Sequence, residues 1–491
     1  MEVIQLHPDV ITFLQGPKQL FINGEWKNSV EGRTFETINP ATEEILAEVY
    51  EAGPYDVDLA VEAAAEAFEN GEWTKISSYE RSKLMNKLAD LMERDMEILA
   101  QLDTLDNGKS INEMLSADLP NAIENLRYFA GWTNKNYGET IPVSGEFLNY
   151  TRHEAVGVVG QIIPWNFPIM MAMWKIAPAL ATGCTIILKP AEQTPLSAIY
   201  LGKLIEEAGF PKGVINIING FGKIAGEALV RHPKVNKIAF TGSTPVGQRI
   251  MKIAADTLKR VTLELGGKSP NIILPDADLD KAIPGVFSGI MVNQGQVCCA
   301  GSRVFIPRHM YKEVTDKLVD YANRVKLGNG LDESTTMGPL VSKRQQEIVT
   351  SYIQKGVEEG ACLLVGGKTR EAGYYVTPTV FTEVEDHMTI AKEEIFGPVV
   401  VAMPYDDLEE VIERANASSY GLAAGVWTEN VKYAHKVANL LKAGTVWVNC
   451  YNITNAAVPF GGYKESGFGR EMGSYALSNY TEVKSVWINL E

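Results

Sequence analysis

The chain has few cysteines, no excess of positive charge and no long uninterrupted apolar run. Its 491 residues include five cysteines and six histidines, and 45 Lys plus Arg stand against 61 Asp plus Glu. A sparse, odd number of cysteines excludes a disulfide framework and is typical of a reducing compartment, so we expect a cytoplasmic protein. The formal net charge of −16 argues against nucleic-acid binding, which needs clustered positive charge.

Membrane and metal signals are also missing. The most apolar stretch, residues 156–188, is interrupted by three prolines, Asn166 and Lys175, whereas a spanning helix needs about 20 predominantly apolar residues. The first residues lack the basic and apolar regions of a secretory signal. The interrupted apolar stretch therefore predicts no membrane partner. Because there is no Cys-x-x-Cys pair and no His-rich tract, the sequence also predicts no metal site.

Short apolar runs alternate with helical stretches from about residue 156, and this alternation predicts a doubly wound α/β fold with parallel strands. The expected strands of the first series are 157–163, 185–188, 214–218, 237–240 and 261–265, and its helices are 197–208, 224–230 and 246–255. A second α/β series follows, with strands near 271–274, 303–306 and 399–403 and helices near 279–292 and 311–325. We place a domain boundary at Gly266–Gly267.

Local patterns add detail outside these two series. Residues 20–26 predict a hairpin with an Asn-Gly turn, and Ser77 with Glu80 predicts a capped helix start. Residues 140–152 predict a second hairpin, and the tail 484–490 is strand-like. Free strands usually pair with another edge, and the pattern leaves open whether that edge belongs to the same subunit.

Two adjacent cysteines, Cys298 and Cys299, lie in a run of small and amide-bearing residues. A nucleophilic thiol needs a base or a lowered pKa, and no histidine lies close in the sequence. Glu264 is the better candidate, because a carboxyl group late in an apolar strand is poorly solvated and its pKa rises. The alternative is a strand-end acid paired with Lys268.

A rigid amide and a nucleotide signal complete the candidate site. Asn166 lies between two prolines and could donate to an oxyanion, worth about 2.7–4 kcal/mol in other enzymes, or could simply form a turn. Residues 240–247 follow a strand and open a helix, as at phosphate sites, but they lack the GxGxxG and P-loop spacings. Glu192, just past a strand, could accept hydrogen bonds from a ribose diol or merely precede a helix.

Together these segments resemble the motif series of the NAD(P)-dependent aldehyde dehydrogenase superfamily, and the likeness is greatest to its broad-range, non-acylating members that act on acetaldehyde and retinal-type substrates. The matching motifs occur in order over roughly residues 20–490, at 164–168, 189–192, 240–244, 264–268, 295–298, 394–398 and 459–467. The resemblance implies a Rossmann-like dinucleotide-binding domain (1–136 and 156–266), a second α/β catalytic domain (267–467) and a small β oligomerisation element (137–155 and 468–491).

The resemblance also implies an activity. An aldehyde would be oxidised to a carboxylic acid with NAD and water, through a thiohemiacetal and a thioester on Cys298. Glu264 would be the general base for hydrolysis, Asn166 the oxyanion donor, and Lys175 a lysine that supports proton relay. Because CoA-acylating members generally lack this glutamate, Glu264 disfavours that alternative. A hydrolase that uses Cys298 without a nucleotide is the alternative from another class.

The remaining implied residues contact the cofactor, the substrate or a second subunit. Glu192 would repel the 2′-phosphate of NADP, so NAD is expected in preference. The polar Asn121 and Thr454, where relatives often have apolar or aromatic residues, favour medium-chain or bulky aldehydes. Segments 140–152 and 484–490 match elements through which relatives form dimers or tetramers. The implied cofactor-binding residues are Ile162, Pro164, Trp165, Lys189, Glu192, Gly222, Phe240, Gly242, Ser243, Leu265, Glu394 and Phe396, and the implied substrate channel comprises Phe167, Trp174, Thr454, Phe460 and Asn121.

Overall fold

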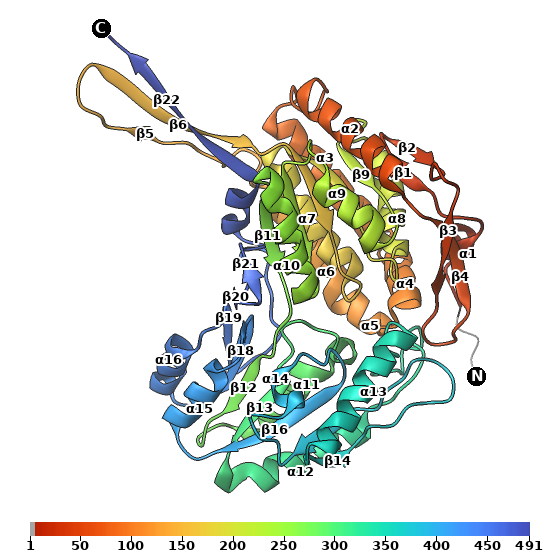
Figure 1. The fold of residues 1–491 in the computed structure, drawn as a ribbon, viewed down its shortest axis with the longest axis vertical. Coiled ribbons are helices and arrows are strands. Elements are labelled where there is room, and N and C mark those ends of the chain that lie inside the picture. Colours follow the sequence, from red (N-terminus) through yellow and green to blue (C-terminus); the bar gives the residue numbers. More distant parts are fainter. Residues whose placement is uncertain (1–4) are drawn as a thin grey trace.

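Two β-sheets with flanking helices form the body of the protein, and a long β ribbon projects from it (Figure 1). The computed structural model describes residues 5–491. The mixed α/β class and the parallel strands that were expected are both confirmed.

The first sheet has eight strands in the order β2-β1-β9-β8-β7-β10-β11-β21, and the run from β9 to β11 is parallel. Its strands are β1 (Leu20–Ile22), β2 (Glu25–Lys27), β7 (Val158–Ile162), β8 (Thr185–Lys189), β9 (Ile215–Ile217), β10 (Lys237–Thr241), β11 (Arg260–Glu264) and β21 (Gly467–Phe468). Its helices include α2 (Pro54–Glu69), α3 (Ser78–Arg94), α4 (Met96–Asn107), α6 (Leu119–Ala130), α7 (Pro168–Thr182), α8 (Leu196–Ala208), α9 (Glu227–Arg231) and α10 (Thr244–Ala254).

The second sheet has seven strands in the order β14-β15-β16-β13-β12-β18-β19, all parallel except the first pair. Its strands are β12 (Pro270–Ile273), β13 (Arg303–Pro307), β14 (Cys362–Val365), β15 (Thr379–Thr382), β16 (Val399–Tyr405), β18 (Ala423–Trp427) and β19 (Thr445–Val448). Its helices are α11 (Leu279–Met291), α12 (Tyr311–Arg324), α13 (Lys343–Glu358), α14 (Thr389–Lys392), α15 (Leu408–Asn416) and α16 (Val431–Leu440).

Shorter elements lie outside these two sheets and their helices. They are α1 (Pro8–Leu14), the pair β3 (Thr34–Ile38) and β4 (Ile45–Tyr50), α5 (Ile111–Glu113), a π-helix (Met114–Asp118), a second π-helix (Gly222–Gly226), the pair β17 (Tyr420–Gly421) and β20 (Tyr463–Lys464), and a 3₁₀ helix (Ser474–Tyr480). The chain passes from the first sheet to the second between Glu264 and Pro270, the interval that contains the predicted boundary. Strand β21 then returns to pair with β11, so the chain crosses between the bodies again near its end.

The local sequence signals are confirmed at the predicted hairpin and helix start. Asn23 and Gly24 turn the chain between β1 and β2 with φ values of 56° and 68°, the left-handed geometry that a tight hairpin requires. At the start of α3, the Glu80 amide donates to the Ser77 hydroxyl at 3.2 Å and the Ser77 amide donates to the Glu80 carboxylate at 2.7 Å. These reciprocal bonds satisfy two donors that the first turn leaves free.

Helix α7 explains the most apolar stretch of the sequence. It lies between β7 and β8 in the chain, begins with Pro168 and ends at Gly183, whose φ of 96° suits a helix C-terminus. Every residue of α7 is buried, including Lys175, so the stretch forms part of the protein core. Among residues 5–491, no helix combines the length and the apolar character needed to cross a bilayer.

The projecting ribbon consists of β5 (Thr140–Ile141), β6 (Phe147–Ala155) and β22 (Thr481–Asn489) (Figure 1). Strand β22 pairs antiparallel with the whole of β6, from Thr481 opposite Ala155 to Asn489 opposite Phe147. The two segments that fitted neither α/β series therefore pair with each other inside one chain. Phe147, Trp487 and Ile488 remain exposed on the ribbon, and the outer edge of β22 has no neighbour among the described residues.

Candidate active site

A cavity of about 530 Å³ lies between the two α/β bodies. The first body contributes the carboxyl ends of β10 and β11, where Thr241 and Glu264 end their strands. The second body contributes Cys298, Gln345 and the segment around Glu394. Ligands of open α/β sheets bind outside the carboxyl ends of the strands, so the position of the cavity suits a nucleotide together with a smaller substrate.

Most residues predicted for the site meet in this cavity. Those that line it are Cys298, Glu264, Asn166, Pro164, Trp165, Gly242, Ser243, Leu265, Glu394, Phe396, Phe167, Trp174, Thr454, Phe460 and Asn121. The predicted residues that do not line it are Lys175, Ile162, Lys189, Glu192, Gly222 and Phe240. Lys175 lies behind the cavity wall, and the others lie along the first sheet and the helices that follow its strands.

A strained turn positions Cys298. Asn293, Gln294 and Gly295 have φ values of 47°, 56° and 71°, and a Cβ atom on Gly295 would lie 2.1 Å from a carbonyl oxygen. Left-handed backbone at two residues other than glycine costs about 1–3 kcal/mol each, so the surroundings must hold it. The Asn293 side chain donates to the Asn166 carbonyl at 2.7 Å, and its amide donates to the buried Glu113 carboxylate at 3.3 Å.

The environment of Cys298 favours the protonated thiol. The contact with Cys299, burial, and the nearby carboxyl groups of Glu394 and Glu264 raise the pKa of Cys298 well above its usual range. The thiolate is the reactive form of cysteine, so the site needs a base to remove this proton.

Glu264 and Glu394 are the two carboxyl groups near Cys298. Burial, followed by the neighbouring Glu471, raises the pKa of Glu264 well above its usual range, and Lys175 and Arg470 partly offset the shift. Its Oε2 atom has no hydrogen-bond partner among residues 5–491. The carboxyl group therefore keeps a free oxygen in the cavity wall.

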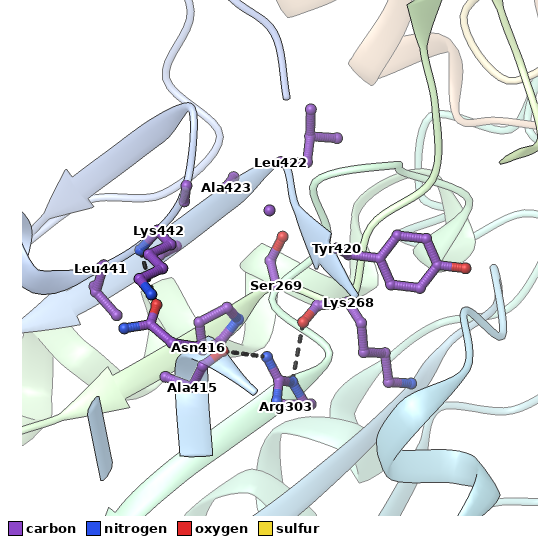
Figure 2. Close-up of a pocket in the computed structure, with 14 residues that line it drawn as sticks. Lys268, Ser269, Arg303, Ala415, Asn416, Tyr420, Leu422, Ala423, Leu441 and Lys442 are labelled. Carbon is purple, nitrogen blue, oxygen red and sulfur yellow. Dashed lines mark hydrogen bonds between the residues drawn. The ribbon is translucent and has the colours of Figure 1, made fainter. Parts of the chain in front are cut away.

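The alternative pairing of Glu264 with Lys268 does not occur in the structure. The Lys268 ammonium is buried, also lacks a hydrogen-bond partner among the described residues, and has its pKa lowered to about 7 by burial. Figure 2 shows that Lys268 contributes its backbone carbonyl to Arg303, which donates to it at 2.9 Å. Lys268 therefore belongs to a separate polar cluster on the second body.

Lys175 and Glu471 form a buried ion pair next to Glu264. Lys175 Nζ contacts Glu471 Oε1, and both side chains are almost completely buried. Glu471 also lines the cavity, and its second oxygen has no hydrogen-bond partner among residues 5–491. Pairing with a carboxylate offsets part of the cost of burying an ammonium, and this contact provides it for the lysine inside the wholly buried α7.

Asn166 combines a structural contact with a free donor. One N–H of its side chain donates to the Gln296 carbonyl at 2.9 Å, which fixes the amide beside the Cys298 loop. The side chain of Asn107 donates at 2.7 Å to the carbonyl of Trp165 and so holds the same segment. Because an amide has two N–H bonds, the second N–H of Asn166 is left for a ligand.

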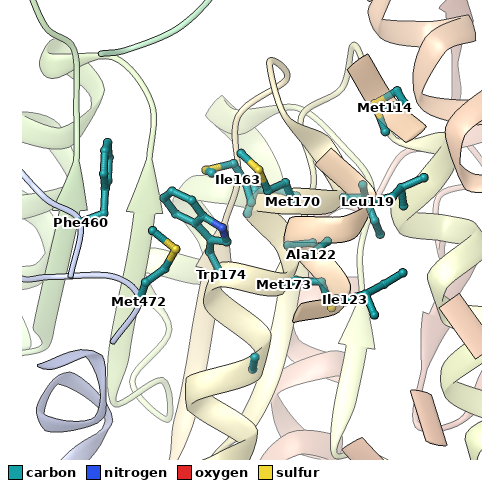
Figure 3. Close-up of a cluster of buried hydrophobic side chains, with 14 of the residues drawn as sticks. Met114, Leu119, Ala122, Ile123, Ile163, Met170, Met173, Trp174, Phe460 and Met472 are labelled. Atoms are coloured by element: carbon teal, nitrogen blue, oxygen red, sulfur yellow. The ribbon is translucent and has the colours of Figure 1, made fainter. Parts of the chain in front are cut away.

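The wall near the thiol is aromatic. Trp174 and Phe460 meet edge to face with their ring centroids 5.4 Å apart, and Figure 3 shows them at one end of a cluster of buried methionine and aliphatic side chains. Polar side chains interrupt this wall: the Thr454 hydroxyl donates to Asn121 at 3.4 Å, and the Cys299 thiol donates to Asn452 at 3.5 Å. A substrate would thus meet mainly apolar surface with amide and hydroxyl groups at one side.

The remaining predicted cofactor residues lie near β8, at the second π-helix and at the start of α10. Lys189 Nζ lies 3.5 Å from Glu192 Oε2 just past β8, and the space around Gly222 is open. Glu192 lies four residues before Leu196, where α8 begins, so it is not in the first turn of that helix. Ser243 begins α10, whose first turn contains no acidic residue and whose free N–H groups suit a phosphate.

Glu394 lies at the other end of the cofactor region. Its Oε1 atom accepts a hydrogen bond from the Gly267 amide at 2.9 Å, and burial raises its pKa to about 7. A Cβ atom on Gly266 would lie 2.5 Å from this carboxylate, so only glycine leaves room for it there.

Several lining residues were not predicted. Glu471, Asn452, Arg344 and Gln345 have no motif around them, and their positions depend on contacts between distant segments. Glu471 is placed by backbone pairing with Phe460, whose amide donates to the Glu471 carbonyl at 2.7 Å. The sequence could have indicated a turn at Asn293, which lies between α11 and Cys298, because Asn tolerates left-handed backbone.

Comparisons with known proteins agree with this geometry. The profile of the aldehyde dehydrogenase family matches residues 26–486. The chain is 66% identical over 481 residues to the putative aldehyde dehydrogenase DhaS of Bacillus subtilis, covering 98% of this chain and 97% of that protein. It is 52% identical over 476 residues to the human mitochondrial aldehyde dehydrogenase, covering 96% of this chain and 92% of that protein.

Solved structures show the same likeness. The NAD⁺ complex of an aldehyde dehydrogenase from Bacillus cereus superimposes with a TM-score of 0.98 at 62% identity, covering 99% of each chain. The betaine aldehyde dehydrogenase of Staphylococcus aureus, in complex with NAD⁺, superimposes with a TM-score of 0.96 at 40% identity, covering 99% of this chain and 97% of that chain.

Proposed function

Because the chain belongs to the aldehyde dehydrogenase family, we propose that it oxidises an aldehyde to the carboxylic acid with NAD and water. One observation carries the proposal: Cys298, Asn166 and Glu264 line a single cavity together with the free N-terminus of α10. The NAD⁺ complex of the Bacillus cereus relative supports the choice of cofactor. Bound NAD would supply the two-electron hydride acceptor.

Cys298 begins the reaction. Glu264 is the carboxylate placed to take the thiol proton, after which Sγ bonds to the aldehyde carbon and the carbonyl π electrons move to oxygen. The free N–H of Asn166 and the backbone N–H of Cys298 would donate to the oxyanion of this thiohemiacetal. Loss of a hydride from the same carbon leaves an acyl thioester on Cys298.

Glu264 completes the reaction. After the carboxyl group has passed the thiol proton to solvent, its carboxylate accepts a proton from a water molecule as the water oxygen bonds to the thioester carbon, and the carbon–sulfur bond breaks to release the acid and the Cys298 thiolate. The pair of Lys175 and Glu471 lies next to Glu264 and would conduct the proton away from the cavity. In a hydrolase that works without a nucleotide, the N-terminus of α10 and Glu192 would have no ligand to bind.

A panel of aldehydes with NAD tests the function directly. We expect NADH and carboxylic acid in equal amounts, no acyl-CoA when CoA is added, and kcat/KM for hexanal at least equal to that for acetaldehyde. NADH absorbance and chromatography of the products make both measurements. Product formation without NAD would instead identify a hydrolase, and acyl-CoA in preference to the acid would identify the acylating reaction.

NAD is proposed in preference to NADP because of Glu192. Its carboxylate would accept hydrogen bonds from the adenosine ribose diol and repel a 2′-phosphate, so we expect kcat/KM to be at least about tenfold higher with NAD. Glu192→Ala should narrow that ratio, chiefly through KM. Equal or higher kcat/KM with NADP in the wild-type enzyme would contradict the assignment.

We also propose a location and an assembly. The sparse, unpaired cysteines support the cytoplasm. The exposed apolar residues and the free edge of the ribbon support self-association to a homodimer or homotetramer. In this assignment residues 1–136 and 156–266 bind the cofactor, 267–467 carry the thiol, and 137–155 with 468–491 join subunits.

A further inference from the structure

We propose that Arg344 binds the diphosphate of the dinucleotide, so that α13 of the second body and the N-terminus of α10 in the first body hold this group from two sides. The inference rests on the proposed use of NAD. It assigns a cofactor contact to a residue that lies outside the motifs of the sequence.

The charges around the cavity single out Arg344. Among the described residues that line the cavity, it is the only lysine or arginine, whereas four carboxylic acids line it. These acids are Asp118, Glu264, Glu394 and Glu471. In a chain of net charge −16, a diphosphate that enters the cavity would meet no cation other than Arg344 among the described lining residues.

Arg344 is also available for a ligand. Its side chain is exposed and forms no ion pair or hydrogen bond with another described residue. By contrast, Lys109 behind the wall is already paired with Asp118 at 2.5 Å, and Lys175 is paired with Glu471. The guanidinium of Arg344 is therefore the one cation at the cavity whose donors are not used within residues 5–491.

The helix directs Arg344 at the cavity. Arg344, Ile348 and Tyr352 lie four residues apart along α13 and all line the cavity, so one face of the helix is turned toward it. The adjacent Gln345 donates at 2.9 Å to the carbonyl of Phe396, which ties the start of α13 to the segment that carries Glu394. The start of α13, which carries Arg344, is thus tied to the segment that carries Glu394.

The opposite wall presents the complementary half of a phosphate site. Gly242 and Ser243 line the same cavity at the start of α10, where the first N–H groups have no acceptor within the helix. Figure 1 shows α10 in the upper body and α13 in the lower one. A planar guanidinium can bond two phosphate oxygens at once, so Arg344 would bind the face of the diphosphate that the helix terminus leaves uncovered.

Binding measurements on the whole enzyme test the proposal. Arg344→Gln should raise the Kd of ADP-ribose and of NAD by about 3–10-fold in calorimetry at low salt, the range for one partly exposed charge-assisted contact. The Kd values of Arg344→Lys should lie between those of the wild type and of Arg344→Gln, because an ammonium keeps the charge but cannot bond two phosphate oxygens in the planar geometry of a guanidinium. Arg344→Gln should also show a weaker dependence of Kd on salt concentration than the wild type.

Lys343→Gln is the matched control. Lys343 precedes Arg344 on the same helix, carries the same charge, does not line the cavity, and bonds only to Gln346 at 2.9 Å, so both Kd values should stay at the wild-type level. An unchanged circular dichroism spectrum checks the fold of each variant.

Three outcomes would overturn the proposal. The first is wild-type Kd values for both ligands in Arg344→Gln while NAD turnover persists, which would leave the proposed function intact. The second is a loss of NAD affinity without a loss of ADP-ribose affinity, which would place the contact at the nicotinamide. The third is an equal change in Lys343→Gln, which would indicate a general surface-charge effect. A wild-type enzyme that binds neither ligand would reject the proposed function as well.

Discussion

Cys298→Ala is expected to lower kcat for aldehyde oxidation by about 10⁴-fold or more, because both halves of the reaction depend on the carbon–sulfur bond that this thiol is proposed to form. The binding of NAD should be unchanged, since the thiol lies on a separate loop from the α10 terminus and Glu192. Steady-state rates with NAD and calorimetry with the same preparation measure the two quantities.

Cys299→Ala is the matched control for this prediction. Cys299 lies beside the nucleophile, and its thiol donates to Asn452. Since the contact with Cys299 is the largest cause of the raised pKa of Cys298, its removal should lower that pKa and extend activity to lower pH. Oxidation that survives in Cys298→Ala and disappears in Cys299→Ala would exchange the roles of the two thiols.

Part of the fold could be predicted because a single strand or helix depends mainly on the apolar pattern of its own residues. Short apolar runs located eight strands, β7 to β13 and β16, and helical patterns located α8, α10, α11 and α12, each to within about two residues. The capping box of Ser77 and Glu80 marked the start of α3. Strands β15, β18 and β19 and helices α13 to α16 were not predicted. Strand order and the return of β21 to the first sheet were not predicted, because pairing between distant segments leaves no local pattern. The π-helix at Met114–Asp118 was also not predicted.

The candidate site divides in a similar way. Motifs with rigid neighbours, such as Asn166 between prolines and Cys298 after a strained turn, brought the right residues to the cavity, while their catalytic roles stay predictions. Glu471 could not be found, because its carboxylate meets Lys175 only after the chain has folded back through its bridge to Phe460. Arg344 was missed because the sequence does not show that it lines a cavity together with acidic residues from distant segments.

These buried charges raise the affinity of one carboxyl group for protons. Desolvation and Glu471 raise the pKa of Glu264, so the group binds protons more strongly than an exposed glutamate, while Lys175 and Arg470 limit the shift. A general base works best when its pKa lies near the operating pH. The surroundings of Glu264 therefore tune it toward proton transfer and away from a permanent ion pair.

Glu264→Gln is expected to separate the two halves of the reaction. Glutamine keeps the shape but cannot accept a proton from water, so thioester hydrolysis should slow by about 10²–10⁴-fold and the acyl enzyme should accumulate. We expect a burst of up to one NADH per site followed by a slow steady state, and mass spectrometry of the quenched enzyme should find the acyl group on Cys298. If Glu264 also takes the thiol proton, the burst becomes slower while its amplitude is retained.

The pH dependence gives this prediction its sign. Below the raised pKa of Glu264 the carboxyl is protonated and cannot accept a proton, so the wild-type hydrolysis rate should rise with pH through that pKa and then level off. Glu264→Gln should lose this rise, because the amide does not titrate. Glu393→Gln, which changes a carboxylate that bonds only to the Tyr352 hydroxyl, is the matched control and should keep the wild-type profile. Wild-type hydrolysis rates and no acyl adduct in Glu264→Gln would remove Glu264 from the reaction.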